Sequence, residues 1–333
     1  MKQSSHSWIA IRAAALLGED ADCKGLVNIL TPSVKAAAIG AWMPDLEDSK
    51  LGSGDTDNHV FKMEPYSGEL ESRFVTSKAD LQKRLGVGRR MVALISEDKT
   101  LDESWWGTPY KASPGPDQNI ANRVQALSTT LKDSLILANK DVAKNIARKF
   151  KLSEQLTDEE RTRPEQVSLY FFMLSHFIAD ACMPCHCDKR YLASYTGHFH
   201  PEWEAVMSKP LDTLFTATKL SQSARSSDEI LEAACANDEA LGVKFDKPVP
   251  VIKDNDVWKE TVAICRASYA INNILASPKE FPVDSRKTLS VKDLDTDPTK
   301  SVLFKSCTSA ALHDAVLNTA TIWKHISKSF TAR

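Results

Sequence analysis

The chain has 333 residues, of which 42% are hydrophobic and 26% are charged. This composition excludes a disordered chain and is typical of a globular protein with a large core. Forty-two basic and 44 acidic residues leave a formal net charge of −2, so no strong overall field attracts the protein to nucleic acid or anionic lipid. Any affinity for phosphate must therefore be local.

The N-terminal part of the chain carries no recognisable membrane or export signal. No run of about 18 apolar residues is present, and the apolar stretch 8–17 contains Arg12. Because no signal peptide is recognisable in the sequence, we expect a cytoplasmic protein or the mature form of a secreted one. Seven cysteines without a regular spacing favour a reducing compartment.

Helical periodicity dominates the sequence. Apolar residues recur every three or four positions in seven stretches, 8–17, 78–94, 119–150, 164–181, 228–241, 257–275 and 308–330. Pro164 followed by Glu165 suits a helix start at 164. Loops are predicted at 43–58, 102–118, 186–201 and 277–300, where Gly, Pro, Asp and Ser accumulate. Convincing strand patterns are scarce, so the sequence predicts an all-α fold.

The helical pattern continues to residue 330 without a clear change in composition. Residues 1–333 are therefore predicted to form a single domain. The one serious linker candidate is 243–254, which contains Pro248 and Pro250. A loop between two helices is the commoner form of such a stretch.

Possible zinc ligands concentrate between residues 176 and 204. His176 and Asp180 lie four positions apart, as do His200 and Glu204, so on helices each pair projects from one face. His186 lies between the two pairs. One such pair alone is ordinary polarity, but a catalytic zinc site needs about three protein ligands and an open position for water. The cluster therefore predicts a metal site.

Three further candidates lie upstream, and each has a simple explanation taken singly. His6 precedes an apolar stretch, Asp45 follows Pro44 in a turn, and His59 falls in a predicted loop. From the residues alone, ordinary structural roles are favoured for all three.

Taken together, these segments resemble the metal-binding segments of the zinc-dependent phospholipase C family. The matching segments are, in order, His6-Ser-Trp-Ile-Ala-Ile-Arg-Ala-Ala, Gly40-Ala-Trp-Met-Pro-Asp45, Asn58-His59, His176-Phe-Ile-Ala-Asp180, Met183-Pro-Cys-His186 and Phe199-His-Pro-Glu-Trp-Glu204. The fungal single-strand-specific nucleases share that fold. The later spacings resemble the bacterial phospholipases, whereas the short arm before His6 resembles the nucleases.

The resemblance implies a single helical domain of this type with about three zinc ions. One zinc would be held by Asp45, His59, His176 and Asp180. Asp180 would bridge to a second zinc held by His6 and by the amino nitrogen and carbonyl oxygen of Met1. A third would be held by His186, His200 and Glu204. Asp45 would be the catalytic residue that orients or deprotonates the attacking water.

Two departures from the family pattern affect these expectations. The separation of His59 and His176 exceeds that of the compact bacterial enzymes and implies a helical insertion at about 66–160. Leu46 and Thr56 stand where choline-preferring relatives carry aromatic side chains, which recognise quaternary ammonium. The resemblance therefore does not imply phosphatidylcholine as the substrate.

The function expected is zinc-dependent hydrolysis of a phosphodiester, most like that of a phospholipase C, by attack of metal-activated water on phosphorus. The substrate would be a phospholipid, with transient contact to a membrane surface, or another phosphodiester. A nuclease acting on nucleic acid with the same trinuclear zinc cluster is the alternative, and a metal-binding protein without catalysis is the third hypothesis. No protein partner is implied.

Other motifs compete for some of these residues. Cys182, Cys185 and His186 form the C-x-x-C-H pattern of c-type haem attachment, and Cys182, Cys185 and Cys187 could form a structural zinc site. Both leave the wider ligand pattern unexplained. His198 could replace His200 as a ligand, but only His200 has a carboxylate four residues later. His313 and His325 are expected to be structural.

Overall fold

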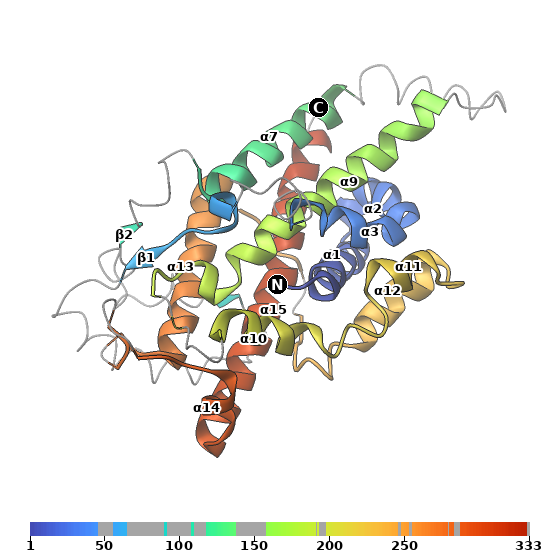
Figure 1. Ribbon diagram of the computed structural model, residues 1–333. Coiled ribbons are helices and arrows are strands. Elements are labelled where there is room, and N and C mark those ends of the chain that lie inside the picture. The colour runs from blue at the N-terminus through green and yellow to red at the C-terminus, as the bar shows by residue number, and fades with distance from the viewer. Residues whose placement is uncertain are drawn as a thin grey trace.

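Long helices form the framework of the molecule (Figure 1). The computed structural model describes residues 1–45, 56–64, 90–91, 108–109, 118–137, 158–190, 192, 198–245, 248–252, 255–278, 280–282 and 287–331. The long helices of these parts are α1 (Gln3–Gly18), α7 (Ile120–Leu137), α9 (Asp158–Ala181), α13 (Val257–Leu275) and α15 (Pro298–Thr331). Shorter helices are α2 (Lys24–Leu30), α3 (Ala37–Gly40), α10 (Phe199–Ser208), α11 (Ala217–Ser221), α12 (Ser227–Ala236) and α14 (Val291–Asp295).

Helix α1 lies in the middle of this framework, against α3, α9, α12 and α15. A helix that is covered on all sides is expected to be apolar around most of its circumference, and most side chains of α1 are buried. Its one charged side chain, Arg12, is buried as well and pairs with Asp238 at 2.8 Å between Nη2 and Oδ2. The guanidinium also lies 4.5 Å from the ring centre of Phe245. Arg12 is therefore tolerated in the core because its charge is neutralised there.

The buried apolar side chains form one contiguous core that extends from Met1 to Ile326. Its largest members include Trp8, Trp203 and Trp323. The linker candidate 243–254 contributes Val243, Val249 and Ile252 to the same core, so it is a loop within one domain. The prediction of an all-α single domain is confirmed.

Regular β-structure is confined, in the described residues, to two strands of two residues each. β1 (Met63–Glu64) pairs with β2 (Thr108–Pro109) in antiparallel fashion. Segment 61–63 also lies beside 186–189, where Phe61 donates its N–H to the carbonyl of His186 and Met63 to that of Cys187. This short parallel contact joins two segments that both carry candidate ligands.

Six of the seven predicted helices correspond to described helices, and most of these differ in their boundaries. The prediction at 257–275 coincides with α13, whereas 8–17 lengthens to α1, 228–241 ends early at Ala236, and 308–330 begins ten residues early at Pro298. Helix α7 covers the first part of 119–150, and 138–150 and most of 78–94 lie outside the described residues. The loop predicted at 277–300 contains α14.

The helix start predicted at Pro164 is wrong, because α9 begins at Asp158. Pro164 is the seventh residue of α9, beyond the first four positions whose N–H groups lack partners, so the helix continues through it without one intrahelical hydrogen bond. Of the predicted insertion at 66–160, the structure describes chiefly α7, which packs against α9, α13 and α15. This part of the segment belongs to the core.

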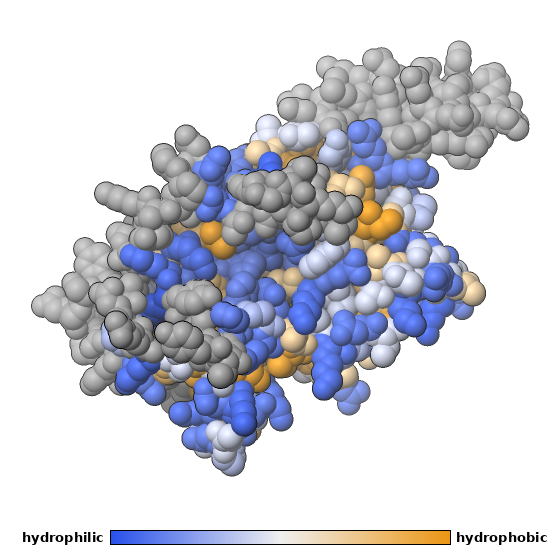
Figure 2. All heavy atoms as spheres, viewed as in Figure 1, coloured by the Kyte–Doolittle hydropathy of each residue, from blue (hydrophilic) through white to orange (hydrophobic). Residues whose placement is uncertain are grey.

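One segment has the length and apolar composition of a membrane-spanning helix, Ala21–Asp45. It consists, however, of the 3₁₀ turns η1 (Ala21–Cys23) and η2 (Thr31–Ala36) and the short helices α2 and α3. Helices α2 and α3 pack against α1 and α9. On the face shown in Figure 2, the described surface is mostly hydrophilic, with small separate apolar groups.

Candidate metal centre

The nine residues predicted to hold metal come from separate parts of the chain and meet beside the N-terminus. Met1 precedes α1, which carries His6. Asp45 follows α3, and His59 ends the 3₁₀ turn η3 (Thr56–His59). The remaining candidate ligands are on α9 (His176 and Asp180), on the 3₁₀ turn η6 (Pro184–His186) and on α10 (His200 and Glu204).

The floor of the site is the C-terminal part of α9. His176 and Asp180 are buried, and because they are four residues apart their side chains meet on one face, with 3.1 Å between Nε2 and Oδ2. The Nδ1 atom of His176 donates a hydrogen bond to the carbonyl of Ala41 at 2.7 Å. This bond directs Nε2 into the site, and an orienting partner of this kind is typical of metal-binding histidines.

A glycine allows this contact between α3 and α9. A Cβ atom at Gly40 would lie 2.7 Å from Cβ of Phe172 and 3.2 Å from the carbonyl oxygen of Leu169. Only a residue without a side chain permits such a close approach. The approach brings the next residue, Ala41, onto His176.

The first ligand group consists of Asp45, His59, His176 and Asp180. Nδ1 of His59 lies 3.8 Å from Oδ1 of Asp45 and 2.7 Å from Oδ2 of Asp180. Nε2 of His176 lies 3.4 Å from Oδ1 of Asp45 and 3.0 Å from Nδ1 of His59. Tetrahedral zinc with bonds of about 2.0–2.2 Å holds its ligand atoms about 3.3–3.6 Å apart. The four side chains thus converge at a separation that suits one ion.

The second ligand group forms around the other oxygen of Asp180. Oδ1 lies 3.5 Å from Nε2 of His6 and 3.5 Å from the amino nitrogen of Met1. Both ring nitrogens of His6 are buried without a hydrogen-bond partner among the described residues, and its ring stacks on His176 at 4.1 Å between centres. His6, Asp45 and His176 also present ligand atoms within 4.8 Å of one another, so the first two groups adjoin.

The third ligand group consists of His186, His200 and Glu204. The Nε2 atoms of the two histidines are 2.9 Å apart. Oε1 of Glu204 lies 2.7 Å from Nε2 of His200 and 3.5 Å from Nε2 of His186. Nδ1 of His186 faces Oδ1 of Asp180 at 3.6 Å. The amino group of Met1 donates a hydrogen bond to Oε1 of Glu204 at 2.6 Å. Met1 therefore lies between the second and third groups.

The charges of the site are strongly coupled. Burial alone would raise the pKa of Asp180. The pKa is nevertheless held well below its usual range by the charges of His176, His186 and the Met1 amino group. Burial alone would lower the pKa of His176 and that of the Met1 amino group. The nearby carboxylates instead raise both pKa values to about 10. In the metal-free protein, protons on these two nitrogens balance the buried carboxylates.

Two further buried histidines of the site, His6 and His186, remain neutral. Burial and the adjacent His176 lower the pKa of His6 well below its usual value. Burial also lowers the pKa of His186, to about 4. Neutral imidazole is the form that binds zinc. Buried lone pairs without hydrogen-bond donors are costly, and a cation in contact with His6 and Oδ1 of Asp180 would satisfy the lone pairs there.

The structure therefore contains buried clusters of His, Asp and Glu that could hold metal ions. Their donor atoms, neutral imidazoles and carboxylates, suit zinc. His198 belongs to none of the three groups found in the described residues, nor do His313, His325 or any cysteine.

These other candidates have contacts of their own. Cys182 accepts a hydrogen bond from Asn318, and burial raises the pKa of the Cys182 and Cys187 thiols. His313 stacks on Phe245 at 5.1 Å. Because His186 faces His200 and Glu204, its geometry agrees with the zinc interpretation and leaves the C-x-x-C-H pattern without its axial ligand.

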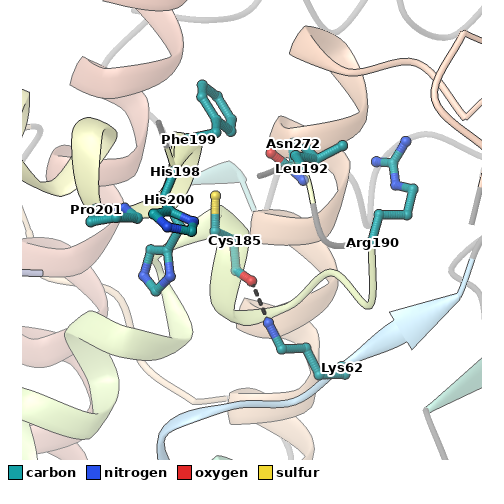
Figure 3. Close-up of a pocket in the computed structure, with 9 residues that line it drawn as sticks. All are labelled: Lys62, Cys185, Arg190, Leu192, His198, Phe199, His200, Pro201 and Asn272. Carbon is teal, nitrogen blue, oxygen red and sulfur yellow. Dashed lines mark hydrogen bonds between the residues drawn. The ribbon is translucent and has the colours of Figure 1, made fainter. Parts of the chain in front are cut away.

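A pocket of about 340 Å³ adjoins the third ligand group. Its wall includes His200 together with Lys62, Cys185, Arg190, His198 and Asn272 (Figure 3). No motif in the sequence marks Lys62, whose only signal is its position three residues after His59. Comparisons with protein-family models, curated proteins and solved structures find no match to this chain.

Proposed function

We propose that this protein is a zinc-dependent phosphodiester hydrolase that acts in the manner of a phospholipase C. The observation that carries the proposal is the position of Asp180. One carboxylate oxygen faces His59 and His176, and the other faces His6 and the Met1 amino group. A carboxylate in this position is suited to bridge two metal ions, the arrangement on which two-metal phosphoryl chemistry depends.

The three ligand groups would each hold one zinc, as the resemblance implies. Zinc ions bound there would polarise the phosphoryl oxygens and lower the pKa of a coordinated water. His176, Asp180 and His6 form a buried floor, whereas the side chains of Asp45 and His200 are 29% and 41% exposed. The substrate would therefore approach from the side of Asp45 and His200.

Asp45 is the chain's best candidate to position the attacking water. Its Oδ1 faces His59 and His176, which leaves its other oxygen able to accept a hydrogen bond from water. Because a metal-bound carboxylate is a weak base, orientation of the water is the main role we assign to it. Asp180 fixes the spacing of the two groups that it joins.

The proposal is tested by metal analysis together with hydrolysis assays. We expect two to three equivalents of zinc in gently purified protein and turnover of phospholipids with release of a phosphorylated headgroup. One equivalent or none would contradict the cluster. Turnover of single-stranded DNA alone would identify a nuclease, and zinc without turnover on phosphatidylcholine, other phospholipids or DNA would indicate a metal-binding protein without catalysis.

A further inference from the structure

Lys62 places a positive charge in the wall of the pocket beside the third ligand group (Figure 3). Its Nζ donates a hydrogen bond to the carbonyl of Cys185 at 2.7 Å, which is a neutral partner. Among the described residues, no carboxylate forms an ion pair with it. Burial lowers the pKa of Lys62, and the nearby carboxylate of Asp188, which already pairs with Arg190, offsets this only in part. The site thus contains a desolvated cation that could bind an anion.

The other cation in the wall is already neutralised. Arg190 pairs with Asp188 at 2.5 Å between Nη2 and Oδ2, and its remaining donors bind Asn273 and the carbonyls of Ala276 and Phe281. In Figure 3 its guanidinium points away from Cys185 and His200. The described residues that line the pocket include no Asp or Glu. A ligand in the pocket would therefore meet the charge of Lys62 without a compensating carboxylate in that wall.

The pocket is also in the right place to receive part of a substrate. It shares His200 with the third ligand group, and Cys185, which holds Lys62, directly precedes His186. Its volume of about 340 Å³ falls in the range of small-molecule sites. One arm of a phosphodiester held at the ligand groups could thus extend into the pocket toward Lys62.

We propose that this pocket binds a second anionic group carried by the substrate and that Lys62 recognises it. The inference rests on the proposed function for the identity of the reacting phosphodiester. It assigns the substrate class as phospholipids with an additional anionic group on the headgroup. A quaternary ammonium headgroup would meet a like charge at Lys62.

The binding test uses phosphonates that differ in one group, on the protein as purified and with its metal content recorded. By calorimetry, we expect phosphonopropionate to bind about tenfold more tightly than propylphosphonate, as a charge-assisted hydrogen bond predicts. Lys62→Met should reduce this ratio to near one, and Lys62→Arg should retain it. Lys209→Met, a change at an exposed lysine at the end of α10, is the matched control. An equal ratio in wild type and Lys62→Met, or no binding of either probe, would overturn the inference.

The source of the anionic group is distinguished by hydrolysis of mixed vesicles. We expect wild type to prefer phosphatidylinositol monophosphate over phosphatidylinositol and over phosphatidylcholine, and Lys62→Met to lose the first preference while it still hydrolyses phosphatidylinositol. Turnover that is the same for all three lipids would overturn the lipid assignment and leave the proposed function intact. A lack of turnover on every diester would refute the proposed function, whereas the phosphonate ratio tests the pocket independently.

Discussion

Asp180→Asn is the substitution that separates the proposed mechanism from a structural role for the site. Both oxygens of Asp180 are used, one toward His59 and His176 and the other toward His6 and the Met1 amino group. An amide keeps one oxygen and replaces the other by NH₂, which cannot bind a metal. Mutation of a residue that only hydrogen-bonds to a metal ligand already costs about 10–100-fold in metal affinity or activity, and a bridging ligand should matter more. We therefore expect kcat/KM to fall by more than about 100-fold, or about 2.7 kcal/mol in transition-state stabilisation.

The same change should destabilise the metal-free protein. It leaves the proton on His176 without its nearest buried carboxylate, whereas the Met1 amino group loses one of two carboxylates and keeps Glu204. Removal of one partner from a buried pair costs about 3–5 kcal/mol. Folding raises the pKa of His176 from 6.5 to about 10 and that of the Met1 amino group from 8.0 to about 10. The stabilisation of the folded state by these two protonated groups is thus complete below about pH 6.5 and is lost as the pH rises through about 10. The difference in unfolding free energy between wild type and variant should shrink over this window.

The assay combines turnover, elemental analysis and denaturant unfolding of the metal-free protein at several pH values. His6→Ala should reduce turnover less than Asp180→Asn, because His6 serves one ligand group. Asp188→Asn is the matched control, since Asp188 is an equally buried carboxylate that pairs with Arg190 outside the ligand groups. It should lower stability without a loss of metal. Near-normal turnover of Asp180→Asn with full metal content would refute the binuclear mechanism.

Three further predictions address other parts of the site. Glu204→Ala should remove one zinc equivalent and leave the circular dichroism spectrum unchanged, because the third group loses its carboxylate; complete unfolding would instead mark that metal as structural. Zinc binding at pH 7 should release about two protons, because the Met1 amino group and His176, each with a pKa of about 10, are protonated and must lose their protons to bind metal. Titration calorimetry in two buffers measures the number of protons released. Zero release would contradict the prediction. Gly40→Ala should cost about 1–3 kcal/mol in unfolding free energy, because the new Cβ would lie 2.7 Å from a side-chain atom of α9, whereas Gly25→Ala, with open space around it, should be neutral or stabilising.

Local patterns in the sequence predicted the parts of the site that depend on a single helix. The pairs His176 with Asp180 and His200 with Glu204 meet as the four-residue spacing requires, because each pair lies on one helix. Long amphipathic helices such as α13 were also predictable, since burial of one face imposes a period on the sequence. Helix ends were less predictable. Helix α9 extends six residues before Pro164, because a proline removes one hydrogen bond and disfavours helix upstream of it without forbidding that helix.

The upstream candidate ligands could not be predicted from local sequence patterns. His6, Asp45 and His59 each have an ordinary explanation in isolation, and the resemblance to a metal-binding family was needed to group them with α9. Their meeting depends on contacts between distant segments, such as the close approach of α3 to α9 at Gly40. No periodicity encodes contacts of this kind.

Lys62 belongs to the site only through the fold, because its position in the sequence does not predict its place beside the pocket. In the sequence it is one of 42 basic residues, and neither spacing nor composition distinguishes it. The fold places it beside Cys185 by pairing segment 61–63 with 186–189, the same contact that brings His59 and His186 to one side of α9. Because the contact that assembles the ligands also positions the cation, a change in this pairing would alter metal binding and substrate preference together. A substitution at Lys62 itself should alter substrate preference alone, which makes the two roles of this short parallel contact separable by experiment.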